Sequence, residues 1–226
     1  MPRSVIATFA LLVLTVATHA APAVRRIAVE NGEGLELVHL VPAPVTYRGH
    51  KALKLVAPAG AFSGDEVALV KDLDFKDGTI EVDLAGLPGP GADPTARGFV
   101  GVAFRSAPHA SQLECFYLRP TNGRADDQLR RNHSAQYVSD PEFPWQKLRT
   151  ETPGVYESYV DLESGAWTHV RIDVKGVSAR LFVNGATQPT LLVKDLKRGD
   201  ISGAIGLWIG PGTEAYFRDL RVTTDR

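Results

Sequence analysis

Two segments of the sequence alternate strictly between apolar and polar residues, and this pattern constrains the fold more than any other feature. In 78–84 (GTIEVDL) every second residue from Ile80 is apolar, and 167–174 (WTHVRIDV) repeats the pattern from Val170. Successive side chains of a β-strand point to opposite faces, so these segments are predicted to be half-buried strands rather than helices.

Further short strands are predicted, separated by glycine, proline and asparagine turns. Asn184-Gly185 fits a type I′ turn, because both residues tolerate positive φ. The apolar register slips between Phe217 and Leu220, which predicts a β-bulge near residues 218–219. No segment of ten or more residues shows helical spacing, so we expect an all-β sandwich of two antiparallel sheets. The other predicted strands are 35–41, 52–57, 67–70, 99–105, 113–119, 156–161, 178–183, 204–209 and 214–223.

The first 20 residues are interpreted as a secretory signal peptide. A basic start at Arg3 precedes an apolar run over 5–17 and small residues around Ala20. The run is shorter than the roughly 20 apolar residues that a membrane anchor needs. We therefore expect cleavage after Ala20, with Ala23 as a second choice. We expect an exported, periplasmic or extracellular protein, with 21–226 as a single domain and no later transmembrane segment.

Charge and cysteine content argue against a nucleic-acid-binding protein and against a disulfide-stabilised fold. The chain has 25 Lys and Arg against 26 Asp and Glu, so it lacks the basic surface that nucleic-acid binding requires. Cys115 is the single cysteine, which rules out an internal disulfide and suggests a buried, inert thiol.

The stretch 120–154 shows little alternation and is predicted to be one long irregular connection. Connections of this length inside a domain are usually functional or disordered. This one contains Tyr137, Phe143 and Trp145, whereas disordered segments are poor in aromatic residues. We therefore expect an ordered, functional loop.

Six pieces of sequence together resemble a known family. They are 98–105 (GFVGVAFR), 114–124 (ECFYLRPTNGR), 167–172 (WTHVRI) with 179–185 (ARLFVNG), 203–210 (GAIGLWIG) and 214–220 (EAYFRDL). They resemble the concanavalin A-like lectin/glucanase superfamily and, within it, the 3-keto-disaccharide hydrolase domain family, over residues 74–223. The resemblance implies a jelly-roll sandwich that acts on glycosides oxidised at C3. The 167–172 and 182–185 pieces are shared with laminin G-like and lectin domains, so they indicate fold alone.

The segment 117–133 and nearby aromatic residues are the strongest candidates for a sugar site. Sugar sites combine planar polar groups with an aromatic platform. The alternative is a solvated loop tied by surface Arg–Asp pairs. The predicted substrate-binding residues are Tyr117, Arg119, Asn122, Arg124, Asp127, Gln128, Arg131, Trp145 and Tyr159.

His133, Glu157 and Asp126 are the candidate catalytic residues. A carbonyl at C3 of a sugar acidifies the C2 proton, which a general base such as His133 or Glu157 could remove. An arginine could stabilise the resulting enolate. A divalent metal held by Asp126, Asp127 and His133 stays open, and so does a non-catalytic, lectin-like carbohydrate-binding module as the alternative function.

Overall fold

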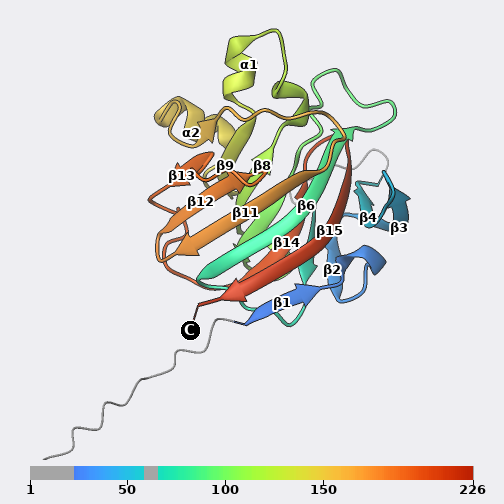
Figure 1. Cartoon of the computed structure of the whole chain (residues 1–226). Coiled ribbons are helices and arrows are strands. Elements are labelled where there is room, and N and C mark those ends of the chain that lie inside the picture. The colour runs from blue at the N-terminus through green and yellow to red at the C-terminus, as the bar shows by residue number, and fades with distance from the viewer. Residues whose placement is uncertain (1–22, 59–65, 226) are drawn as a thin grey trace, which may run out of the picture.

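The computed structural model describes residues 23–58 and 66–225 and consists of two antiparallel sheets packed face to face (Figure 1). The predicted signal peptide, 1–20, lies outside the described residues. No helix among the described residues is long and apolar enough to cross a membrane.

The larger sheet has eight strands over the described residues. Its order is β13-β12-β11-β6-β15-β4-β3, with β1 also paired to β15. The strands are β1 (Val24–Ile27), β3 (Val41–Tyr47), β4 (His50–Val56), β6 (Gly78–Pro88), β11 (Thr168–Lys175), β12 (Ser178–Val183), β13 (Leu191–Val193) and β15 (Thr213–Thr224).

The second sheet has seven strands in the described part of the chain, in the order β10-β9-β8-β7-β14-β5-β2. They are β2 (Leu35–Val38), β5 (Val67–Val70), β7 (Val100–Ser106), β8 (Leu113–Leu118), β9 (Ala135–Asp140), β10 (Glu157–Ser158) and β14 (Ala204–Ile209). The α-helices α1 (Gln128–Asn132) and α2 (Trp145–Glu151) flank β9 in the chain. The 3₁₀ turns are η1 (Val29–Asn31), η2 (Pro108–Ala110) and η3 (Pro120–Asn122).

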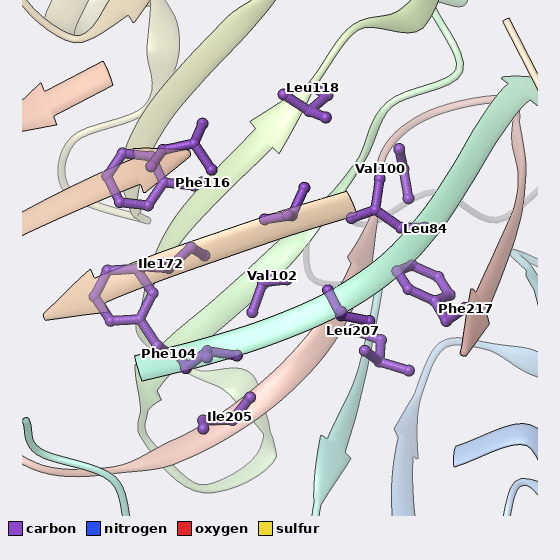
Figure 2. Close-up of a cluster of buried hydrophobic side chains, with 14 of the residues drawn as sticks. Leu84, Val100, Val102, Phe104, Phe116, Leu118, Ile172, Ile205, Leu207 and Phe217 are labelled. Carbon is purple, nitrogen blue, oxygen red and sulfur yellow. The ribbon is translucent and has the colours of Figure 1, made fainter. Parts of the chain in front are cut away.

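Apolar side chains from both sheets fill the space between them. Ile80 and Ile172, the apolar positions of the two alternating segments, are fully buried there. Figure 2 shows Phe104 and Phe116 of the second sheet among the side chains of this core. Burial of this kind is the main favourable contribution to folding. The predicted all-β jelly-roll sandwich of two antiparallel sheets is confirmed.

Two predicted backbone features are confirmed. The pairing of β15 with β6 shifts register between Arg218 and Arg221, where the bulge was expected, and Asp219 has a φ of 53°. Asn184 and Gly185 have φ values of 51° and 73°, as a type I′ turn requires.

The interpretation of 120–154 as one irregular connection is wrong. The stretch contains α1, β9 and α2, with β9 paired to β8 along its full length. Both faces of β9 are covered, since Tyr137 points into the core while Val138 packs in a separate cluster on the outer face. Without a solvent-facing side, the strand shows no alternation. The predicted strand 156–161 shortens to β10. β1 and β13 were not predicted, and β3 was missed apart from its first residue, Val41, which ends the predicted strand 35–41.

Candidate functional site

A row of side chains crosses the outer face of the second sheet. Strand register aligns Trp208 with Gly101, Gly101 with Tyr117, Tyr117 with Gln136, and Gln136 with Glu157. Tyr117 and Trp208 belong to a cluster separate from the sandwich core, on the opposite face of their strands. Pairing of five strands therefore places an aromatic pair and a carboxylate in one line.

Gly101 is what allows the aromatic pair to form. A Cβ atom on Gly101 would lie 2.3 Å from the carbonyl oxygen of Phe116 and 2.6 Å from Cβ of Tyr117. Without that atom, the Tyr117 and Trp208 rings approach to 4.9 Å between centroids. Such tilted ring pairs stabilise an aromatic floor.

A cavity of about 440 Å³ lies over this floor. Phe99 contacts Tyr117 edge to face at its side, and Trp145 of α2, 38% exposed, lies at the rim. Asp140 also lines the cavity, where burial raises the pKa of its carboxyl to about 6. The size and the mixture of aromatic and polar groups suit one or two sugar rings.

Arg119 is fixed at the end of this floor. Its guanidinium donates hydrogen bonds to Oη of Tyr117 at 2.6 Å and to the carbonyl of His133 at 2.8 Å. It also donates to Oε1 of Gln136 at 3.3 Å, and it lies 5.8 Å from the Trp145 ring centre. The predicted binding residues Tyr117, Arg119 and Trp145 are thus brought together.

His133, Glu157 and Arg149 form a polar cluster next to Arg119. Nδ1 of His133 lies 2.8 Å from Oε2 of Glu157, an ion-pair distance without the alignment of a hydrogen bond. Arg149 of α2 donates to the same carboxylate from Nη2 at 2.7 Å and from Nε at 3.0 Å. The Glu157 side chain is 5% exposed, so this fork satisfies a buried charge.

Burial lowers the pKa of His133, and the positive charges of Arg149 and Arg119 add to that effect. The carboxylate of Glu157 opposes it by raising the pKa. The imidazole is therefore neutral at neutral pH. The negative charge of Glu157 beside Nδ1 favours the tautomer that carries the proton on Nδ1, although the contact lacks hydrogen-bond alignment. In that tautomer Nε2 is the proton acceptor. The described residues supply no hydrogen-bond partner to Nε2.

His133 lies where two further cavities meet. One, of about 290 Å³, adjoins the aromatic cavity at Phe99 and Trp145 and is also lined by the predicted residue Asn122. The other, of about 650 Å³, contains Glu157 and the predicted residue Tyr159. The two candidate acid/base residues are therefore both adjacent to open space.

The remaining predicted residues do not line these cavities. Arg124 is exposed and forms ion pairs with Asp161 and Glu163. Arg131 donates to Oη of Tyr159 at 2.9 Å and lies over its ring.

Three predicted polar residues belong to α1 or its approach. The Asp127 carboxylate caps the helix by accepting from the backbone N–H of Arg130 at 3.1 Å. Gln128 bonds Asn132 one turn along the same helix, and Asp126 is exposed. Among the described residues, no group of three or more His, Cys, Asp or Glu is placed to hold a metal.

Several site residues were missed by sequence reasoning. Gln136, Asp140 and Arg149 lie in the stretch taken as irregular, so no strand face or helix could be assigned to them. Trp208 lies in a predicted strand, but glycines on both sides hide which face it occupies. Its register opposite Gly101 is the information that was lacking.

Comparisons with known proteins establish the fold. No family model matches the chain, and no curated protein matches its sequence. Among solved structures, the carbohydrate-binding module CBM66 from Bacillus subtilis is similar, with a TM-score of 0.56, 14% identity and coverage of 84% of this chain and 96% of that chain.

Two further structures are similar. A Parabacteroides distasonis protein provisionally assigned as a glycosyl hydrolase has a TM-score of 0.51 at 13% identity, covering 90% of this chain and 100% of its own. The apo Crh5 transglycosylase has a TM-score of 0.52 at 11% identity, covering 90% and 85%. The chain thus has the jelly-roll fold found in carbohydrate-binding modules and in glycosyl hydrolase-like proteins.

Proposed function

We propose that the protein is an exported enzyme that cleaves glycosides carrying a carbonyl at C3, with His133 as the general base. The observation that supports this most is the 2.8 Å contact of His133 Nδ1 with the buried Glu157 carboxylate, beside open cavities. A carboxylate on one ring nitrogen orients the ring and makes the other nitrogen the acceptor of a substrate proton.

The reaction follows from the acidity of the C2 proton. Nε2 of His133 removes that proton, and the C2–H electron pair forms a C2=C3 double bond with negative charge on the C3 oxygen. Collapse of this enolate breaks the bond between C1 and the glycosidic oxygen, and the leaving oxygen takes a proton from the imidazolium or from water. The products are a free sugar and an unsaturated keto sugar, to which water adds.

Arg119 and Arg149 are suited to the charge that develops. Both line the same cavity as His133, and both are held in place, Arg119 by Tyr117 and Arg149 by Glu157. Preorganised cations in a partly dry site stabilise an oxyanion strongly because they do not need to reorganise during the reaction. An unoxidised glycoside has no C3 carbonyl and gains nothing from this arrangement.

A non-catalytic carbohydrate-binding module is the second candidate. The aromatic cavity over Tyr117 and Trp208 and the similarity in fold to CBM66 favour it. A binding module needs the aromatic platform and polar rim but not the contact of the partly exposed His133 with the buried Glu157.

The test is to incubate the chain from residue 21 with a 3-keto-disaccharide and with its unoxidised parent, each with and without a chelator. Release of monosaccharide from the oxidised substrate alone is the expected result. Binding of both sugars without release favours the module. Loss of release in chelator assigns a required metal, which the proposed roles of His133 and the arginines do not include.

A further inference from the structure

The cavity of about 290 Å³ beside His133 is lined by four arginines. Arg97 comes from the connection between β6 and β7, Arg119 follows β8, Arg130 lies on α1 and Arg149 on α2. Asn122, a threonine, two aromatic residues and His133 complete the lining, and no carboxylate of the described residues belongs to it. Four separate segments therefore bring positive charge to one small space.

Only one of these arginines has an acidic partner within the described part of the chain. Arg149 pairs with Glu157. Arg97 donates to the backbone carbonyls of Pro94 at 2.7 Å and Ala96 at 3.0 Å, both neutral acceptors. Asp93 lines the aromatic cavity, and its carboxylate accepts hydrogen bonds from the N–H and hydroxyl of Thr95. Its charge acts on Arg97 without a direct ion pair between the two described residues.

The other two arginines likewise have neutral partners. Arg130 makes long contacts of 3.4 Å with Oδ1 of Asn122. Arg119 bonds the Tyr117 hydroxyl, the Gln136 amide and a backbone carbonyl. A guanidinium bonded to neutral oxygens keeps its full charge, and its remaining N–H groups can donate to a carboxylate or a sulfate.

The four cations form two pairs with different surroundings. Burial lowers the pKa of Arg119, the charge of Arg149 lowers it further, and Tyr117 and the carboxylate of Glu157 oppose this shift. Burial lowers the pKa of Arg97, the charge of Arg130 lowers it further, and the charge of Asp93 opposes both. Arg97 and Arg130 therefore repel each other. The repulsion between Arg97 and Arg130 is relieved when an anion lies between them.

We infer that Arg97 and Arg130 form a subsite for an anionic substituent, so that the ligand of the adjoining aromatic cavity is an acidic sugar. The substituent is a carboxylate or a sulfate ester, because both offer paired oxygens to a planar guanidinium. This inference rests on the proposed function only in taking the ligand to be a sugar, and it holds for an enzyme or a binding module.

The test compares charged sugars with a neutral twin of the same shape. Methyl β-glucuronide, methyl β-glucoside and a 6-sulfated methyl β-glucoside are titrated by NMR at millimolar concentrations, at low and high salt. We expect the acidic sugars to bind at least about tenfold more tightly than the neutral one, with an advantage that shrinks at high salt. Comparison of methyl β-glucuronide with the 6-sulfated glucoside shows whether the subsite prefers a carboxylate or a sulfate.

The variant Arg97→Gln/Arg130→Gln should reduce the ratio of the affinity for the acidic sugars to that for methyl β-glucoside to about one. Its affinity for methyl β-glucoside and its thermal unfolding temperature should stay unchanged. Arg180→Gln, an exposed arginine of β12, is the matched control and should keep the advantage. The double variant answers the question only if it folds, whereas the salt series on the unaltered protein does not depend on any substitution.

No tighter binding of the acidic sugars, including no binding of any of the three, contradicts the inference. The two proposals fail separately. Keto-dependent release without an acidic preference overturns the subsite alone, and an acidic preference without keto-dependent release overturns the enzyme alone.

Discussion

Nδ1 of His133 lies 2.8 Å from Oε2 of Glu157, although His133 ends the turn after α1 and Glu157 begins β10. Pairing of β10 with β9 sets this distance, because Glu157 stands opposite Gln136 just beyond the start of β9. Arg149 then holds the carboxylate from the other side. The geometry of the proposed base is therefore a consequence of strand register.

The pH dependence of cleavage should reflect this pair. Since burial lowers the pKa of His133 and the base acts when neutral, activity should rise with pH below the ordinary histidine value and then level off. Glu157→Gln removes the contribution that raises this pKa, so the rising limb should move to lower pH while the plateau rate falls. A pH profile of kcat/KM for both proteins measures this. A limb that moves to higher pH in the variant contradicts the assignment.

Trp145→Ala should weaken sugar binding with little effect on stability. The indole is 38% exposed at the cavity rim, so its loss removes about 1–2 kcal/mol of binding free energy but less than about 1 kcal/mol of unfolding free energy. Trp167→Ala, at the residue just before β11 of the other sheet, is the control and should leave affinity unchanged. Calorimetric titration and thermal unfolding measure both quantities. Equal affinity loss in the two variants places the sugar elsewhere.

Gly101→Ala should destabilise the fold. The added Cβ meets backbone at 2.3 Å and the Tyr117 side chain at 2.6 Å, and overpacking of this kind costs about 1–3 kcal/mol or more. Gly89→Ala, whose Cβ meets nothing closer than 3.6 Å, should be nearly neutral. Urea unfolding of the two variants makes the comparison. Similar stabilities would mean that the aromatic floor is not as tightly packed as described.

Asp140→Asn should remove part of the pH dependence of stability. Burial raises the pKa of Asp140 to about 6, so the folded protein holds this proton more tightly than the unfolded chain. The unfolding free energy of the unaltered protein should therefore fall by at most about 3 kcal/mol as pH rises from about 4 to 6. The variant should lack this fall, whereas Asp126→Asn, at an exposed position, should retain it. Urea unfolding at several pH values reports the difference, and parallel curves for all three proteins contradict it.

The parts of the fold that could be predicted are those with one face toward solvent. Ile80 and Ile172 lie in strands whose outer residues are polar, so alternation indicated both the strand and its buried face. β9 is covered on both sides, and Tyr137 and Val138 in succession hide its period. The helix α2 has seven residues, too few for a helical repeat to stand out.

The candidate site, too, could be predicted only in part. His133 and Glu157 were predicted as separate candidates from their chemistry, and the structure places them in contact. Arg149 could not be predicted, because its role depends on where α2 packs. Arg124 and Asp127 are of residue types that bind sugars, but Arg124 forms an ion pair with Asp161 and Asp127 caps α1. Composition alone does not distinguish a polar group that lines a cavity from one that ties a loop.

The most direct test of the account is the rate of monosaccharide release from a 3-keto-disaccharide by His133→Asn and by His169→Asn. His169 is a matched control, because its Nδ1 also lies 2.8 Å from a carboxylate, that of Asp83, but on the other sheet. The account predicts a loss of about 10²-fold or more for His133→Asn and nearly unchanged release for His169→Asn. Undiminished release by folded His133→Asn contradicts it.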